Sequence, residues 1–137
     1  MAVAGFTVAY GCVLVAALLP VVCAGIAKYG MFAKPPHEGG YDNHNPRAWL
    51  AAQTDWRARA NAAQANTFEA LPFFMAAIVI AHQLGAAQAL VDMLALAFVF
   101  LRLLYIVLYL ADAALARSGV WTLALLVNIA ILFAGYR

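Results

Sequence analysis

The chain has 137 residues, of which 67% are hydrophobic and only 10% are charged. A soluble domain has about 25% charged residues, and this chain has too little polar sequence to coat a water-soluble core. The formal net charge of +2 points to no particular partner, and without a basic patch interleaved with aromatic residues we expect no nucleic-acid binding.

Four long apolar segments follow one another along the chain: 3–27, 67–81 with a polar helical lead-in from Asp55, 89–110, and 120–136. A spanning helix needs about 20 mostly apolar residues. The first segment lacks the basic start of a signal peptide, so we expect it to be a retained helix. None of the segments alternates apolar and polar residues as barrel strands do. The sequence therefore predicts an all-α fold: one four-helix transmembrane domain over residues 1–137, surrounded by membrane lipids.

Basic residues are distributed unevenly among the three connections between these segments. The second connection, residues 82–88, has no Lys or Arg, whereas the third contains Arg117. By the positive-inside rule, the first and third connections then lie in the cytoplasm, and both termini lie on the other side of the membrane. The first connection holds most of the basic residues: Lys28, Lys34, Arg47, Arg57 and Arg59.

The first connection also carries the signals of a short helix near the membrane surface. Asn45 is a suitable N-cap, and Pro46 suits the first helical position. Trp49 follows within the next turn and is expected to lie at the membrane interface.

Two charged residues, Glu69 and Arg102, lie inside the predicted spans. Charges inside a membrane are costly, so such residues are functional candidates. Each is expected about 15 Å along its helix from the cytoplasmic side, at a rise of about 1.5 Å per residue. We therefore expect the two side chains to form an ion pair. An ion pair that only fixes the register of the two helices is the alternative.

The polar neighbours of both charges follow the three-and-four spacing of a single helix face. This pattern predicts a polar pocket that opens toward the cytoplasm and suits a small anionic, zwitterionic or amphipathic ligand. Asn128, deeper in the fourth helix, is expected to form an interhelical hydrogen bond. The residues that line these faces are Arg59, Asn66, Glu69 and Phe73 on the second helix, Arg102, Tyr105, Tyr109 and Asp112 on the third, and Arg117 and Ser118 at the start of the fourth.

The remaining reactive side chains give no second site. The three histidines lie in loops or at a helix end without ligand spacing, so no metal site is expected. Cys12 and Cys23 lie on one face of the first helix, about three turns apart. That separation is too long for a disulfide, and we interpret both as small packing residues.

Several motifs resemble those of one membrane family. The segment 66–73, with the sequence NTFEALPF, resembles the N-x-x-E-x-x-P signature of the second helix in the MAPEG family, the membrane-associated proteins of eicosanoid and glutathione metabolism. Arg102, Tyr105 and Tyr109 are similar to the third-helix motif of that family, and Arg117-Ser118 to the start of its fourth helix. The loop 41–47, with the sequence YDNHNPR, resembles the bacterial branch of the family.

The resemblance implies a homotrimer of four-helix subunits, in a bacterial inner membrane, with periplasmic termini and a cytoplasm-facing site. It also implies glutathione as co-substrate and a transferase or peroxidase activity, in which the thiolate attacks a lipophilic electrophile or a peroxide. Arg117, with Ser118 as helper, would stabilise the thiolate. Glutathione would be bound by Lys28, Arg59, Asn66, Glu69, Arg102, Tyr105 and Tyr109.

One departure from the family pattern supports an alternative function. Well-studied eukaryotic members place an arginine on the turn just before the signature asparagine, whereas residues 62–65 read AAQA here. Since fold does not determine function, the alternative is a non-catalytic or lipid-binding protein of the same fold. Such a protein could serve as an accessory subunit with a membrane-protein partner.

Overall fold

The computed structural model describes residues 5–136, which form five α-helices and one short 3-10 helix. The four long helices are α1 (Val8–Lys28), α3 (Asp55–Gln83), α4 (Gln88–Leu110) and α5 (Ala114–Phe133). Each is long and apolar enough to cross a membrane. No strand occurs among the described residues, so the prediction of an all-α fold with four spans is confirmed.

The ends of two helices differ from the sequence prediction. The predicted start of the first span at Val3 lies outside the described residues, and α1 begins at Val8. The last span begins earlier than predicted, at Ala114 instead of Val120. The strong helix formers at 114–116 explain this extension, because they follow directly on the turn that Asp112 makes with a φ of 58°. Arg117 and Ser118 therefore lie within α5.

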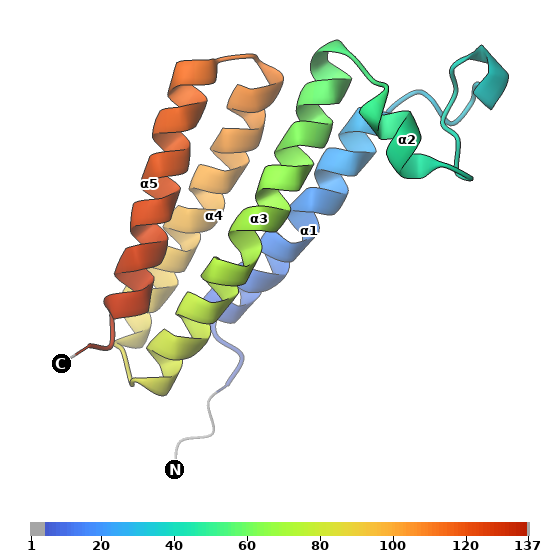
Figure 1. Ribbon diagram of the computed structural model, residues 1–137. Coiled ribbons are helices and arrows are strands. Elements are labelled where there is room, and N and C mark those ends of the chain that lie inside the picture. Colours follow the sequence, from blue (N-terminus) through green and yellow to red (C-terminus); the bar gives the residue numbers. More distant parts are fainter. Residues whose placement is uncertain (1–4, 137) are drawn as a thin grey trace.

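The four long helices run side by side, and consecutive ones are antiparallel (Figure 1). Helix α1 packs against α3 and α4, and α5 packs against α4 and α3. Alanines let the backbones approach closely, and the rings of Phe74 and Phe98 stack between α3 and α4 with centroids 4.1 Å apart. Cys12 and Cys23 are buried and free, as predicted. The buried alanines of the main core are Ala9, Ala16, Ala77, Ala81, Ala95 and Ala124.

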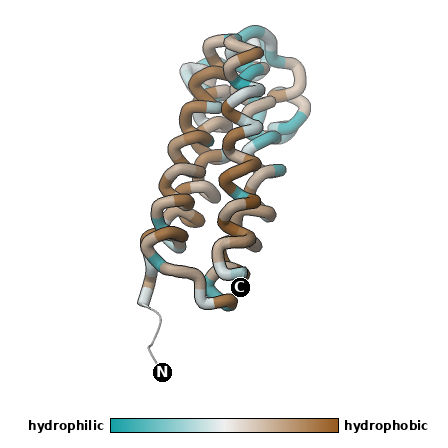
Figure 2. Tube along the Cα trace, turned by 90° about the vertical axis from the view of Figure 1, so that its left-hand side faces the viewer, coloured by the Kyte–Doolittle hydropathy of each residue, from teal (hydrophilic) through white to brown (hydrophobic). Residues whose placement is uncertain are grey.

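The connection between α1 and α3 contains the 3-10 helix η1 (Pro36–Glu38) and helix α2 (Pro46–Ala51). Pro46 occupies the predicted first position of α2, but the side chain of Asn45 makes no capping hydrogen bond. Hydrophilic residues gather at this end of the bundle, which we call the loop end, while the long helices are mostly hydrophobic (Figure 2). The loop end therefore belongs at a membrane surface.

Two arginines at the start of α3 bind the ends of neighbouring helices. Arg57 Nη1 donates to the carbonyl oxygen of Ala27 at the end of α1, at 2.8 Å. Arg59 Nε donates to the carbonyl oxygen of Leu110 at the end of α4, at 3.1 Å. The last carbonyls of a helix lack partners within it, and a cation there also complements the helix dipole. These two basic residues thus help to hold the loop end together.

Candidate functional site

A chain of hydrogen bonds links α3 to α4 near the middle of the bundle. Arg102 Nη2 donates to Asn66 Oδ1 at 3.0 Å, and Asn66 Nδ2 donates to Glu69 Oε2 at 3.3 Å. The Asn66 amide therefore accepts from the cation with its oxygen and donates to the carboxylate with its nitrogen. This arrangement fixes the orientation of the amide, because the flipped form would satisfy neither neighbour.

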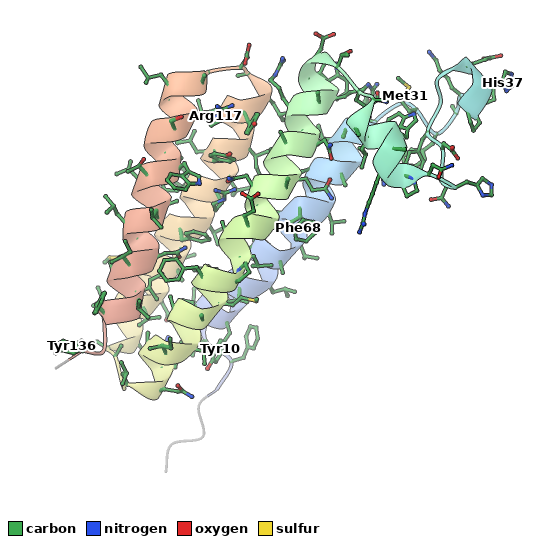
Figure 3. The ribbon with its side chains drawn as sticks, in the orientation of Figure 1. Tyr10, Met31, His37, Phe68, Arg117 and Tyr136 are labelled. Atoms are coloured by element: carbon green, nitrogen blue, oxygen red, sulfur yellow. The ribbon has the colours of Figure 1, made fainter. Side chains whose placement is uncertain are left out.

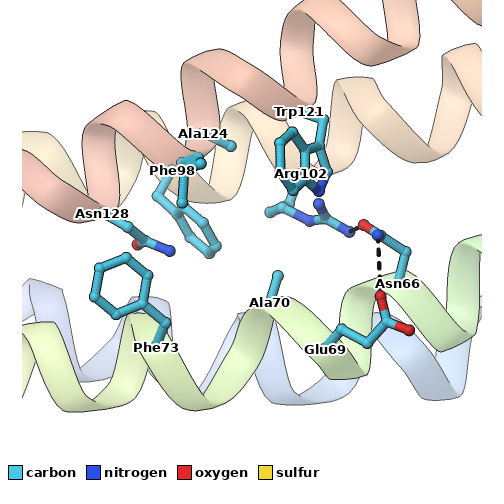
Figure 4. A pocket seen from close by; sticks show the side chains of 10 residues that line it. Asn66, Glu69, Ala70, Phe73, Phe98, Arg102, Trp121, Ala124 and Asn128 are labelled. Atoms are coloured by element: carbon cyan, nitrogen blue, oxygen red, sulfur yellow. Dashed lines mark hydrogen bonds between the residues drawn. The ribbon is translucent and has the colours of Figure 1, made fainter.

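The predicted ion pair between Glu69 and Arg102 is wrong within the subunit. Among residues 5–136, the structure has one salt bridge, between His37 Nε2 and Glu38 Oε1 at 3.6 Å. Asn66 lies one turn before Glu69 on the same face of α3, so its amide occupies the space between the two charged groups (Figure 4). Glu69 and Arg102 lie at a similar depth in the bundle, as predicted, but they are linked only through the amide of Asn66.

Thr67 is a second partner of Arg102 that the sequence analysis missed. Arg102 Nη2 donates to Thr67 Oγ1 at 2.9 Å, and the Thr67 hydroxyl donates to the carbonyl oxygen of Ala63 at 2.7 Å. Both Arg102 and Thr67 are buried. The spacing of Ala60, Ala63 and Thr67 along α3 could have identified this inward face, since the three residues recur every three or four positions.

Arg102 is a buried cation whose hydrogen-bonding capacity is only partly used. Its side chain is 1% exposed, and Nε has no hydrogen-bond partner. The guanidinium carbon lies 4.2 Å from the ring centroid of Tyr105, a cation–π distance. No carboxylate within the described chain forms a salt bridge with it. The side chain therefore keeps the capacity to bind an anion.

An inner cavity of about 160 Å³ lies beside this group, between α3, α4 and α5. Asn66, Glu69, Arg102 and Trp121 border one end of it, and the other end is bordered by Phe73, Phe98, Ala124 and Asn128 (Figure 4). Its lining consists of Asn66, Glu69, Ala70, Phe73, Phe98, Arg102, Trp121, Ala124, Leu125 and Asn128.

Asn128 does not form the predicted interhelical hydrogen bond. Its Oδ1 atom is buried and has no partner, although the residue is only 3% exposed. The side chains that lie near it in Figure 4 are the rings of Phe73 and Phe98, which offer no hydrogen-bonding atoms. Asn128 is therefore a cavity-lining residue.

An outer hollow of about 390 Å³ lies closer to the loop end, between α4 and α5. Arg117 lies on α5 toward the loop end (Figure 3). Its guanidinium carbon is 4.1 Å from the ring centroid of Tyr109. The rings of Tyr105 and Tyr109 meet edge to face at 5.6 Å. The hollow is lined by Tyr105, Tyr109, Arg117, Ser118, Trp121 and Thr122. Trp121 borders both spaces, so they are adjacent.

Seven of the nine predicted site residues line these two spaces. Lys28 and Arg59 do not. Lys28 Nζ lies 4.4 Å from the ring centroid of Tyr41, in the connection to α3. Arg59 binds the end of α4, as described above. Within one subunit, the candidate site thus contains two arginines, Arg102 and Arg117, with the two tyrosine rings between them.

This arrangement is suited to an elongated anionic ligand. Arg102 and Arg117 provide two positive charges at different depths, and the tyrosine hydroxyls and the Asn66 amide provide hydrogen bonds. A cation beside a thiol favours the thiolate, which is the nucleophilic form. The apolar inner cavity gives a lipophilic molecule space next to the charged groups.

Comparison with known proteins gives one result. No curated protein and no solved structure matches the chain. The profile of the MAPEG family matches residues 8–136, which is nearly the full length of the chain and covers all four spans. The chain is therefore an integral membrane protein that belongs to the MAPEG family, as its motifs predicted.

Proposed function

We propose that the protein is a glutathione-dependent transferase or peroxidase that acts on lipophilic electrophiles or peroxides at the membrane. The observation that carries this proposal is the environment of Arg102, which is buried, has no carboxylate partner in the described chain, and borders a cavity. A buried charge is costly unless it is paired and hydrogen-bonded. A bound anion would provide the missing partner, and glutathione is the ligand associated with the family.

Each candidate residue has a chemical role in this proposal. Asn66, Arg102, Tyr105 and Tyr109 would bind the carboxylates and amides of glutathione. Glu69 accepts only from Asn66 and would bind the ammonium group of glutathione. That places the thiol near Arg117, the second cation of the site.

The reaction begins with the thiolate of glutathione. Arg117 would stabilise its charge, and the hydroxyl of Ser118 would donate a hydrogen bond to the sulfur. The sulfur forms a bond to an electrophilic carbon as the leaving group departs with the bonding electron pair. With a hydroperoxide, the sulfur instead attacks the terminal oxygen: an S–O bond forms as the O–O bond breaks, and the departing alkoxide takes up a proton to become the alcohol. A second glutathione then reacts with the resulting sulfenic acid to give glutathione disulfide and water. Each route needs the thiolate at neutral pH, so Arg117 is the residue on which the proposed activity depends most.

We further propose that the active form is a homotrimer in a bacterial inner membrane. In one subunit the Glu69 side chain is exposed on a spanning helix, where a charge facing lipid is unfavourable. A neighbouring subunit would cover it, and trimers are general in the family. The distribution of basic residues supports a cytoplasmic loop end and periplasmic termini. On this basis Lys28 and Arg59 remain proposed glutathione contacts, since a neighbouring subunit can approach them.

The proposal is tested by titrating the purified protein with glutathione in mild detergent. We expect a rise in melting temperature and an ultraviolet absorbance from the bound thiolate. Arg117→Ala should abolish the thiolate absorbance. Lys34→Ala removes the same charge from the exposed connection and should leave the absorbance unchanged. If saturating glutathione alters neither signal in the native protein, the catalytic proposal fails.

One observation favours the alternative of a non-catalytic or lipid-binding protein. Residues 62–65 contain no cation, and Lys28 and Arg59 lie outside both spaces of the subunit, so few cations are available for the two carboxylates of glutathione. A lipid headgroup carries a single phosphate and needs fewer cations. A rise in melting temperature with anionic phospholipid, without any response to glutathione, would support this alternative.

A further inference from the structure

The inner cavity has a deep end that the binding of glutathione does not explain. This end is formed by Phe73 from α3, Phe98 from α4, and Ala124, Leu125 and Asn128 from α5. Asn128 lies about 16 Å farther along α5 than Arg117, at a rise of about 1.5 Å per residue. The deep end therefore lies well inside the apolar part of the bundle, beyond the charged groups.

Asn128 is a buried amide whose carbonyl oxygen accepts no hydrogen bond within the described chain. It is 3% exposed, and its Oδ1 atom is unpartnered, while the neighbouring cavity walls are apolar. Nearly all buried polar groups in proteins are hydrogen-bonded, because an unpaired one loses its bonds to water without replacement. Figure 4 shows the amide nitrogen of Asn128 toward the cavity, so this end of the cavity suits a molecule that carries an oxygen able to accept a hydrogen bond from that nitrogen.

The size and the walls of the cavity limit what this molecule can be. Its volume is about 160 Å³. This volume covers the whole cavity, including the end beside Asn66 and Arg102. An engineered apolar cavity of about 150 Å³ in another protein binds benzene, so the cavity as a whole has room for one six-membered ring. The walls include Phe73 and Phe98, which favour packing against another ring. Ala124 lies one turn before Asn128 on the same face of α5, and its small side chain leaves the ring this space.

We propose that the deep end of the inner cavity binds a ring of the lipophilic substrate, and that Asn128 selects a ring carrying a hydroxyl group. The inference rests on the proposed function, because the polar end of the same cavity contains Asn66 and Arg102 of the glutathione site. A ring bound at Asn128 shares the cavity with Asn66 and Arg102, but it lies about 16 Å from Arg117 along the bundle, so the electrophilic group would belong to the other end of an elongated substrate. Asn128 is thus a specificity-determining residue for the second substrate.

The test compares phenol and toluene, two probes that share a ring and differ in that only phenol carries a hydroxyl group. Melting temperatures of the purified protein in detergent are measured at equal free concentrations of each probe, without glutathione, and converted to dissociation constants. We expect phenol to bind about tenfold more tightly than toluene, which corresponds to one buried hydrogen bond. Equal affinity of the two probes for the native protein would overturn the proposal.

Four variants test whether any preference for phenol arises in this cavity. Asn128→Leu has a similar volume and no amide, so it should lose the preference for phenol and still bind toluene. Asn128→Ala also removes the amide and should lose the same preference. Ala124→Leu fills the cavity and should lose both probes. Leu126→Ala changes the same helix at an exposed position and should keep the preference. Retention of the preference in both Asn128 variants, or of phenol binding in Ala124→Leu, would contradict the proposal.

The same samples separate this inference from the proposed function. The glutathione titration is carried out on the native protein in parallel. Selective phenol binding without a thiolate absorbance would support the ring subsite and reject the glutathione-dependent activity. A thiolate absorbance without selective phenol binding would reject the ring subsite alone.

Discussion

The bundle contains two polar clusters, and they differ in how completely their groups are paired. The far-end cluster, opposite the loop end, consists of Thr7, Tyr10, His82, Gln88 and Asp92. Asp92 Oδ1 accepts from the backbone N–H of Ala9 at 2.8 Å and from Gln88 Nε2 at 2.7 Å. His82 Nδ1 lies 2.7 Å from the Ile78 carbonyl oxygen, and its ring stacks on Tyr10 at 4.5 Å.

The other cluster, around Arg102, retains unused bonding capacity. In the described part of the chain, the buried side-chain atoms without a partner are Arg102 Nε and Asn128 Oδ1, and both residues line the inner cavity. The carboxylate of the far-end cluster, by contrast, binds the first turn of α1, where the helix dipole also favours a negative charge. Among the described residues, the far-end cluster has no buried side-chain atom without a partner, so it stabilises the fold, whereas the cluster around Arg102, beside a cavity, can bind a ligand.

The largest expected effect comes from Arg102→Leu. We expect the affinity for glutathione to fall about a hundredfold, the equivalent of one or two hydrogen bonds to a charged group. Stability should change by less than about 1 kcal/mol, because the variant removes a buried charge that lacks a carboxylate partner. The dissociation constant comes from the thiolate titration, and the stability from melting temperature in detergent.

The outcome for Arg102→Leu also tests the contrast between the clusters. Thr67→Val, which removes one partner of Arg102 and keeps the shape of the side chain, is the matched control and should weaken binding less. If Arg102→Leu instead destabilises the protein by several kcal/mol with an unchanged affinity, the cluster around Arg102 is structural and the contrast is wrong.

Asp92→Ala should have the opposite effects. The substitution removes the acceptor for Ala9 N–H and for Gln88, so we expect a loss of about 2 kcal/mol in the free energy of unfolding. Affinity for glutathione should stay the same, since Asp92 lines neither the inner cavity nor the outer hollow. Asp92→Asn keeps an acceptor oxygen and should lose less stability. A weakened affinity in either variant would show that the two clusters are coupled.

The sequence predicts the fold better than it predicts the contacts within the site. The four spans follow from hydropathy and length, because a bilayer accepts few structures other than helices. Helix periodicity also places Asn66, Glu69, Arg102, Tyr105 and Tyr109 on the correct faces. It does not fix which side chains touch, because the rotation of each helix about its axis depends on packing across the whole bundle.

The errors in the site have this common origin. The charges of Glu69 and Arg102 suggest a direct pair, but the intervening amide of Asn66 is a matter of side-chain geometry. Arg59 falls on the predicted polar face, but its hydrogen bond to the Leu110 carbonyl oxygen at the end of α4 was not predicted; its contact with glutathione stays a prediction. Thr67 carries no charge, so nothing in the sequence marks it as a site residue, although it accepts a hydrogen bond from the buried Arg102.

Substitutions of Glu69 test how much the binding of glutathione by the cluster around Arg102 depends on its exposed residues. Glu69→Ala removes the acceptor that orients the Asn66 amide, so we expect the affinity for glutathione to fall about fivefold to tenfold. Glu69→Gln keeps a carbonyl oxygen for Asn66 but removes the charge that is proposed to bind the ammonium group of glutathione, so we expect a similar loss of affinity. A clearly smaller loss in Glu69→Gln than in Glu69→Ala would mean that Glu69 acts only by orienting the Asn66 amide. Thiolate titrations of the two variants give the comparison.

The smallest effect is expected at Lys28, the predicted site residue whose ammonium group lies over the ring of Tyr41 at 4.4 Å. Lys28→Met keeps most of the side-chain length and removes the charge. Loss of the cation–π contact should cost about 0.5–1 kcal/mol locally, in the connection between α1 and α3. Loss of the proposed contact to glutathione should lower its affinity about threefold, as expected for a partly exposed charge. Tyr41→Leu removes the same cation–π contact from the other side and serves as the control. A loss of affinity in Lys28→Met, but not in Tyr41→Leu, would support a direct contact of Lys28 with the ligand, whereas unchanged affinity in both variants would contradict it. Because Lys28 lies outside both spaces of its own subunit, a direct contact would mean that the ligand is bound between subunits and that the boundary of the site extends beyond the single bundle.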